Sequence, residues 1–296
     1  RGFGMKRLLK LTAIRLMAAV GHLPLPLVRG LGWALGQVLY VLARERKHIA
    51  RTNWRLCFPH DDEATRDRAV KAHFVAFAQA LMDRGWLWHA SRAVVSKRLR
   101  MTCRTDALQG TEPVVVFAPH FVGLDAGWSA LTVHLPRLCC GLYAPQSDAV
   151  VDDWMAQGRK RFGDPQVIAK WQGLKPLAAA LRSGKPLYLL PDMDHNLNDS
   201  VWAPFFGHQV ATLTSLPRFA TLGRAKVVPV LVRMTPQGYD IEVLPPWDNY
   251  PTGDVNADVV RMNRELENMI AVQPEQYYWV HKRFKTRPQG EGSVYG

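Results

Sequence analysis

Short, largely apolar runs alternate with amphipathic stretches along most of the chain. The runs fall at residues 113–118, 138–143, 186–190, 226–232 and 239–244. Stretches with helical spacing of apolar residues lie between or beside them, at 62–99, 123–133, 148–161, 174–183, 211–222 and 255–272. Strands that alternate with helices usually form a mostly parallel sheet covered on both faces. The sequence therefore predicts an α/β fold with a mostly parallel mixed sheet, in which the turn at 236–238 joins one antiparallel pair.

The N-terminal region, residues 8–43, is mostly apolar and reads as two helical pieces separated by Pro24 and Pro26. The second piece, residues 30–43, has about 14 residues, fewer than the roughly 20 that cross a bilayer. We therefore expect a monotopic or barely spanning membrane anchor over residues 5–48 and one α/β domain over 49–296. Two amphipathic helices packed on that domain are the alternative. Residues 1–4 are expected to be an added remnant, with Met5 as the native start.

The chain is strongly basic, with 38 Lys and Arg against 25 Asp and Glu, a net charge of +13. Such an excess attracts nucleic acid, an anionic membrane surface or an acidic protein. The sequence contains no helix-turn-helix, zinc or RNA-recognition signature, so we expect no nucleic-acid partner. The four cysteines lack metal-ligand spacing, which indicates free thiols in a reducing compartment.

His120 and Asp125 form the main candidate catalytic pair, in the segment His120-Phe-Val-Gly-Leu-Asp125. His120 follows directly after a predicted buried strand, where chemistry is commonly placed in parallel sheets. A carboxylate on one ring nitrogen fixes the tautomer of a histidine that takes a proton on the other. We expect Asp125, in the first turn of the next helix, to reach back to the ring.

A second polar segment, Pro191 to Asn196, also follows a predicted strand. Its alternating acids resemble the start of a calcium loop, but Leu197 and Ala203 stand where that loop needs Gly and Glu. Asp192, Asp194 and His195 could still bind a divalent ion. We instead expect the two acids to orient arginines around an anionic substrate, with no metal and no cofactor.

Arg159 and Arg161 belong to a basic cluster at the end of a predicted helix. A solvated charged face and a phosphate- or carboxylate-binding site are both open for such a cluster. Phe205 and Phe206 lie in an apolar turn that either joins the core or forms the wall of a lipid-binding groove. The four residues complete the predicted substrate-binding set.

Taken together, these motifs resemble the late acyltransferases of lipid A biosynthesis, the lauroyl and myristoyl transferases of Gram-negative bacteria, within the HX4D/E acyltransferase superfamily. The resemblance is carried by stretches spread in order along the chain: residues 53–59, 118–125, 158–161, 191–194, 203–207 and 274–288. The last stretch, Pro-Glu-Gln-Tyr-Tyr-Trp-Val-His-Lys-Arg-Phe-Lys-Thr-Arg-Pro, is the longest and the most specific.

The resemblance implies a fold like that of glycerolipid acyltransferases and a site on the cytoplasmic face of the inner membrane, in contact with its phospholipids. It implies an acyl–acyl carrier protein donor and a hydroxyacyl group of a Kdo-bearing lipid A precursor as acceptor. His120 takes the place of the family's base and Asp125 that of its partner, while Arg159 and Asp192 match the family's arginine and aspartate near the site. Acylation of another lipid, such as a lysophospholipid, and hydrolysis by His120 with water are the alternatives.

Overall fold

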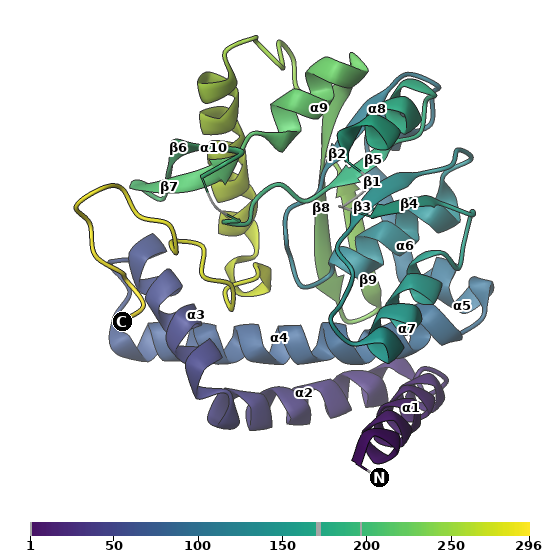
Figure 1. Cartoon of the computed structure of the whole chain (residues 1–296). Helices are drawn as coiled ribbons and strands as arrows, with labels where there is room; N and C mark the ends of the chain where they lie inside the picture. The colour runs from purple at the N-terminus through teal and green to yellow at the C-terminus, as the bar shows by residue number, and fades with distance from the viewer. Residues whose placement is uncertain (1, 170–172, 196) are drawn as a thin grey trace.

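The computed structural model describes residues 2–169, 173–195 and 197–296; Arg1 and Asn196, which the sequence interpretation used, lie outside this set. A seven-stranded sheet forms its centre, in the order β1-β9-β8-β2-β5-β3-β4 (Figure 1). Its strands are β1 (Leu99–Cys103), β2 (Val114–Phe117), β3 (Cys140–Tyr143), β4 (Gln166–Ala169), β5 (Leu187–Leu189), β8 (Lys226–Thr235) and β9 (Gly238–Val243). Only β8 and β9 pair antiparallel in this sheet as described; the other neighbours are parallel. The predicted mostly parallel mixed sheet is confirmed.

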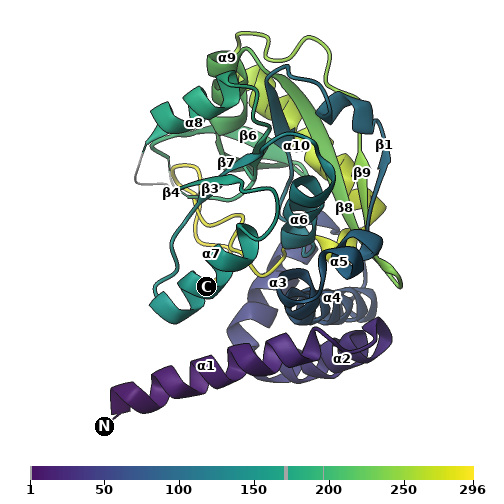
Figure 2. The same ribbon diagram turned by 90° about the vertical axis from the view of Figure 1, so that its right-hand side faces the viewer.

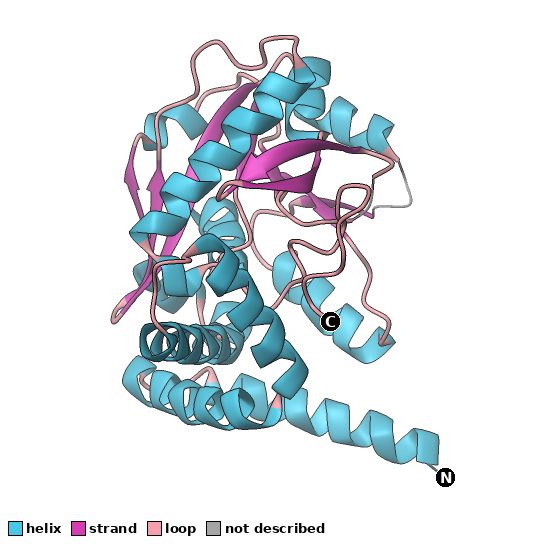
Figure 3. Ribbon diagram, turned by 90° about the vertical axis from the view of Figure 1, so that its left-hand side faces the viewer, coloured by secondary structure: helices cyan, strands magenta, loops and turns pink. Residues whose placement is uncertain are grey.

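Ten α-helices are described, and they surround the sheet and form a separate layer below it (Figures 1 and 3). They are α1 (Gly2–Val20), α2 (Leu25–Leu42), α3 (Arg44–Cys57), α4 (Glu63–His89), α5 (Arg92–Arg98), α6 (Leu124–His134), α7 (Ala149–Arg159), α8 (Leu174–Arg182), α9 (Ser215–Gly223) and α10 (Val255–Val272). The longest, α4, begins where the Asp62 side chain accepts a hydrogen bond from the Thr65 amide at 2.7 Å. Such a cap satisfies one of the amide groups left free at a helix start.

Both faces of the sheet are buried, as the strands' continuous apolar runs predict. In β2, Val115 and Phe117 pack into a core with α8, α9 and α10. Val114 and Val116 point the other way, into a core with α4 and α6. Because successive strand residues face opposite sides, a strand covered on both sides must be apolar throughout.

A two-stranded antiparallel ribbon, β6 (Ser200–Phe205) and β7 (His208–Leu213), is a correction to the sequence interpretation. The sequence predicts a polar loop up to residue 200 and a helix from residue 211. The helix α9 instead begins at Ser215, because residues 208–213 pair across the turn with β6. β1 and β4, at the two edges of the sheet, were also not predicted.

The N-terminal helices are arranged around α4, with α2 packed along it (Figure 1). Gly32 and Gly36 face α4; a Cβ at either position would come within 2.6 Å of its backbone, at Gln79 and Val75 respectively. A buried ion pair fixes the same contact, since Arg29 donates to Asp83 at 2.9–3.1 Å. Asp83 also accepts from Tyr239 Oη at 2.7 Å, which ties α4 to β9.

The predicted break at Pro24 and Pro26 is confirmed, but α2 begins at Leu25 and has 18 residues, longer than the expected second piece. Pro26 lies in the first turn, where a missing amide hydrogen costs nothing. By length and composition α2 could cross a membrane, and it is the one described helix that passes this test. Figure 2 shows α1 projecting from the body next to α2. Large apolar side chains of both helices are exposed: Met5, Leu8, Leu9, Leu11, Leu16, Leu27, Leu31, Trp33, Val38, Val41 and Leu42.

The glycine contact makes a prediction about how α2 is held. Gly36→Ala places a methyl group against the α4 backbone, and we expect it to lower the free energy of unfolding by about 1–3 kcal/mol. Gly30→Ala is the matched control on the same helix, because a Cβ there meets nothing within 4 Å. In thermal melts in the same detergent, Gly36→Ala should have the lower melting temperature of the two variants. Equal melting temperatures would show that α2 does not pack on α4 in this way.

Candidate active site

His120 and Asp192 follow two neighbouring strands. β2 and β5 pair in parallel, with Val115 opposite Leu187 and Phe117 opposite Leu189. His120 lies three residues after the end of β2, and Asp192 three residues after the end of β5. The carboxyl ends of parallel strands meet at one edge of the sheet, so both side chains reach the same place. The sequence prediction that each follows a strand is confirmed.

Asp192 is the carboxylate that holds the histidine ring. His120 Nδ1 lies 2.8 Å from Asp192 Oδ1, and the backbone amide of His120 donates to the same carboxylate at 3.1–3.2 Å. Asp192 is fully buried, whereas the His120 side chain is 23% exposed. With Nδ1 used in this contact, Nε2 is the ring nitrogen left to face a substrate.

The C-terminal segment completes the support of this pair. Tyr277 Oη donates to Asp192 Oδ2 at 3.0 Å, and the Tyr278 amide donates to the His120 carbonyl at 2.9 Å. Burial raises the pKa of the Asp192 carboxyl, but the charge and hydrogen bonds of His120 and the charge of Arg283 outweigh it, so the pKa lies below its ordinary value. Asp192 is therefore ionised at neutral pH.

Asp125 does not make the contact that the sequence predicts. Its carboxylate is bound by two arginines: Arg159 Nε donates to Oδ1 at 2.9 Å, and Arg84 donates to Oδ2 at 2.9–3.0 Å. Burial raises the pKa of the Asp125 carboxyl, but these two guanidinium groups outweigh the effect and hold it below its usual range. The physical reason for the correction is competition, because Asp192 already occupies His120 Nδ1 and fixed positive charges attract Asp125.

His120, Arg84 and Asp125 line a cavity of about 500 Å³ between α4, α6 and α7. This is within the range typical of small-molecule sites. Its apolar lining comes largely from α4, the loop after β2, α6 and α7: Phe77, Ala80, Leu81, Leu87, Val122, Leu124, Ala126, Val151, Met155 and Met193. The cavity thus combines a polar group of His120, Asp125 and Arg84 with a longer apolar wall.

His281 is a second histidine in this cavity. Burial, with the nearby charges of His120 and Arg283, lowers the pKa of His281 to about 4. It is therefore uncharged at neutral pH, and its Nε2 accepts a hydrogen bond from the Asp194 amide at 3.3 Å. Because that nitrogen is already in use, His281 is less suited than His120 to take a proton from a substrate.

Two predicted substrate-binding residues have other partners. Arg161 donates to the Leu87 and Ala90 carbonyls, where it satisfies the C-terminal end of α4. Asp194 is buried, and its carboxylate accepts from the amide and hydroxyl of Thr286 at 2.7 and 2.8 Å. Both side chains make contacts that hold the fold together around the site, and their contact with a substrate stays a prediction.

The predicted lipid wall at Phe205 and Phe206 is also placed elsewhere. Phe205 is fully buried in the core against Arg283, and Phe206 packs against Phe58 with ring centroids 5.3 Å apart. Neither lines the cavity that contains His120. Sequence reasoning missed Arg84, which has no motif around it. The apolar positions of α4 that line the cavity were recognised at helical spacing, but they were taken only as core.

A divalent-ion site at Asp192, Asp194 and His195 finds no support in the geometry. Over residues 2–169, 173–195 and 197–296, no group of three or more His, Cys, Asp or Glu side chains is placed to hold a metal ion. Asp192 and Asp194 are each directed to the partners described above.

The fold and the site define an α/β protein with a carboxylate-held histidine at a sheet edge, beside a cavity with a long apolar wall. Comparison with known proteins shows which reaction this class of protein catalyses. Residues 5–286 match the family model described as bacterial lipid A biosynthesis acyltransferase. The chain belongs to this family and is an acyltransferase.

Particular relatives cover most of its length. The chain is 32% identical to the lipid A biosynthesis lauroyltransferase of Escherichia coli K12 over 282 residues, covering 93% of this chain and 91% of that one. It is 31% identical to the palmitoleoyltransferase of the same organism, with 93% and 90% covered. A solved structure, the 1-acyl-sn-glycerophosphate acyltransferase PlsC from Thermotoga maritima, matches with a TM-score of 0.37 and 12% identity, covering 82% of this chain and 94% of that one.

The ion cluster of Asp125, Arg84 and Arg159 should stabilise the protein in a pH-dependent way. Asp125→Asn leaves two guanidinium groups without their carboxylate, and we expect a loss of about 3 kcal/mol at pH 7, at the low end for buried pairs because both arginines are partly exposed. A carboxyl whose folded pKa is lowered stabilises the protein above its unfolded pKa of about 4 and loses that effect as the pH falls further. Denaturant unfolding at pH 7 and pH 3 should therefore show the difference between wild type and variant shrinking in acid. A difference that does not change with pH would contradict the ion cluster.

Proposed function

We propose that this enzyme transfers a fatty acyl chain from acyl–acyl carrier protein to a hydroxyacyl group of a Kdo-bearing lipid A precursor. The observation that carries the proposal is the His120–Asp192 pair at the polar end of a largely apolar cavity, in a chain of the lipid A acyltransferase family. In this proposal His120 is the general base and Asp192 is its positioning residue. Asp125 holds two arginines, whereas the sequence predicts that it holds the ring of His120.

The chemical step is a direct transfer between two bound substrates. His120 Nε2 removes the proton from the acceptor hydroxyl while the oxygen attacks the thioester carbonyl. The new ester C–O bond forms, the C–S bond breaks, and the proton passes from the imidazolium to the leaving thiolate. No Ser or Cys is among the described residues that line the cavity, which favours transfer without a covalent acyl-enzyme.

The arginine cluster supplies positive charge next to the histidine. Arg84 and Arg159 together carry two positive charges against the single negative charge of Asp125. One positive charge is left in excess in a partly buried site, where it acts more strongly than in water. We assign Asp125 to holding both guanidinium groups toward the thioester oxyanion or an anionic group of the acceptor.

The apolar wall is the proposed place for the acyl chain. Phe77 and Leu81 of α4 and Met155 of α7 line the cavity together with His120. Burial of each methylene contributes about 0.8 kcal/mol, so the depth of this wall would set the preferred chain length. The net charge of +13 suits both an acidic carrier protein and an anionic acceptor.

We also propose that residues 5–48 attach the enzyme to the cytoplasmic face of the inner membrane, with residues 49–296 as the catalytic domain. α2 presents exposed Leu27 and Leu31 on the side opposite Gly32 and Gly36, the two glycines that face α4. Its other side packs on a helix that carries exposed Arg68 and Lys71, which would be costly inside a bilayer. This packing favours a monotopic attachment in which only the exposed face of α2 enters the lipid.

Kinetics can separate the roles of the two carboxylates. His120→Ala should lower kcat by about 10²–10⁴ with a near-normal thermal melt, because the base is removed from a partly exposed position. Asp192→Asn should lower kcat with little change in KM, because the ring loses its orientation. Asp125→Asn should raise KM, because the arginines hold the acceptor's anionic group less well, and should lower kcat less than Asp192→Asn does, because both guanidinium groups remain in the site. Near-normal turnover of the His120 variant, or a kcat effect of Asp125→Asn larger than that of Asp192→Asn, would refute these assignments.

The substrate class is tested by mass spectrometry of lipid A from cells with and without the active protein. We expect a mass difference of one acyl chain, whose size gives the chain length, and no difference with His120→Ala. In parallel, the purified enzyme receives one labelled acyl–acyl carrier protein and either the lipid A precursor or a lysophospholipid. Label in the lysophospholipid alone would identify another acceptor, and release of free fatty acid without an acceptor would identify a hydrolase.

A further inference from the structure

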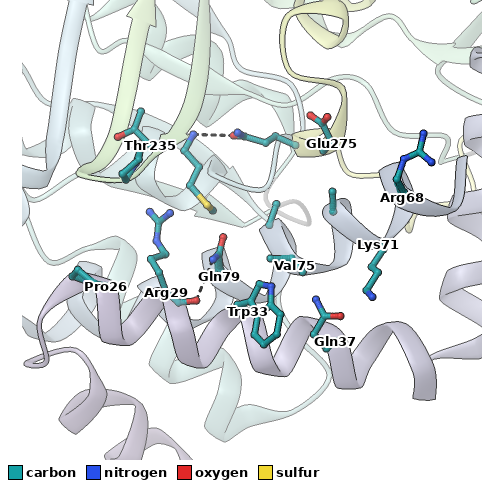
Figure 4. A pocket seen from close by; sticks show the side chains of 15 residues that line it. Pro26, Arg29, Trp33, Gln37, Arg68, Lys71, Val75, Gln79, Thr235 and Glu275 are labelled. Carbon is teal, nitrogen blue, oxygen red and sulfur yellow. Dashed lines mark hydrogen bonds between the residues drawn. The ribbon is translucent and has the colours of Figure 1, made fainter. Parts of the chain in front are cut away.

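A second cavity, of about 780 Å³, lies between α2, α4 and the β8–β9 turn (Figure 4). Its residues are distinct from those around His120. The backbone contact between Val122 and Gln276, 2.8 Å from amide to carbonyl, lies between the two, with Val122 in the first cavity and Gln276 in the second. This second cavity is not used by the proposed reaction.

The lining of the second cavity is apolar in the middle and basic at one end. Trp33 of α2 and Val75 of α4 lie in its middle, and Arg68 and Lys71 of α4 lie at one end (Figure 4). Trp33 is 56% exposed, on the same helix as the exposed apolar side chains that face away from the domain. Tryptophan at such a place is typical of the boundary between lipid chains and headgroups.

The charges around this cavity sum to a net positive value. Among the described residues, Lys71 has no hydrogen-bond or ion-pair partner, and Arg68 donates only to Thr65 Oγ1, at 2.9 Å. Arg29, also in the lining, is neutralised by Asp83. Glu275 is the one acidic side chain in the lining as described. Arg68 and Lys71 thus exceed Glu275 by one positive charge.

We propose that this cavity binds one anionic phospholipid of the bilayer, with its phosphate at Arg68 and Lys71 and an acyl chain along Trp33 and Val75. Charge complementarity identifies the headgroup, and the apolar middle of the cavity, continuous with the exposed face of α2, identifies the chain. The lipid would fix the depth of α2 and α4 at the membrane surface. The inference rests on the proposed membrane attachment, but it does not depend on the identity of the acyl acceptor.

Native mass spectrometry of the full chain in neutral detergent tests the site, with phosphatidylglycerol or phosphatidylcholine added. We expect one bound phosphatidylglycerol per chain and much weaker binding of phosphatidylcholine. Arg68→Gln with Lys71→Gln should weaken phosphatidylglycerol binding roughly 30-fold, at about a fivefold loss for each basic residue. Lys175→Gln with Arg182→Gln removes the same charge from α8, on the far side of the molecule from α2 (Figure 1), and should leave binding unchanged.

A second pair of variants distinguishes lipid binding inside the cavity from general attraction of the lipid to positive charge. Ala72→Trp fills the proposed site from an exposed position and keeps both cations, and we expect it to abolish the bound lipid. Gln146→Trp fills the cavity around His120 and should not affect binding of the lipid in the second cavity. Equal losses in both charge variants, binding that survives Ala72→Trp, binding lost in Gln146→Trp, or equal binding of both lipids would each overturn the proposal. Because the measurement needs no turnover, its failure is distinguishable from a failure of the proposed reaction.

Discussion

The buried carboxylate of Asp192 joins three separate parts of the chain at one point. It accepts hydrogen bonds from the amide and the ring of His120, after β2, and from Tyr277 in the C-terminal segment. A buried, ionised carboxylate is tolerated only when such donors replace water. The loop after β2, the loop after β5 and the C-terminal segment must therefore fold together for the site to exist. This explains why Tyr277, 157 residues after His120, belongs to the candidate site.

The site contains two carboxylates whose partners are the reverse of those that the sequence predicts. Asp192 holds the ring of a neutral or charged histidine, and Asp125 holds two permanent cations. Each carboxylate thus has its own partners, the ring of His120 for Asp192 and the two guanidinium groups for Asp125. In the proposed reaction, Asp192 orients the His120 ring that accepts the proton, and Asp125 positions the two guanidinium groups.

The α/β fold and the placement of His120 and Asp192 after neighbouring strands could be predicted, because both depend on local patterns. The contact between the two side chains was not predicted, because the spacing of His120 and Asp125 gave the ring to Asp125. The partners of Asp125 could not be predicted, since Arg84 and Arg159 come from helices far apart in sequence. The spacing within one motif does not show which distant side chains compete with His120 for the Asp125 carboxylate. The β6–β7 ribbon was missed for a related reason. Residues 208–213 gain their strand conformation from cross-strand pairing that local helical spacing does not reveal.

The helix α4 connects the N-terminal helices, which we propose attach the enzyme to the membrane, to the cavity that contains His120. One set of its residues packs on α2 at Gly32 and Gly36, another lines the cavity with Phe77, Leu81 and Arg84, and Asp83 between them binds Arg29. Because one helix carries all three contacts, α2 and the Arg84 side chain in the cavity are held at fixed positions relative to each other. The substrates of the proposed reaction come from different phases, an acyl chain on a soluble carrier and an acceptor in the bilayer. In that proposal α4, which contacts both α2 and the cavity around His120, is the element that holds the reacting groups where these two phases meet.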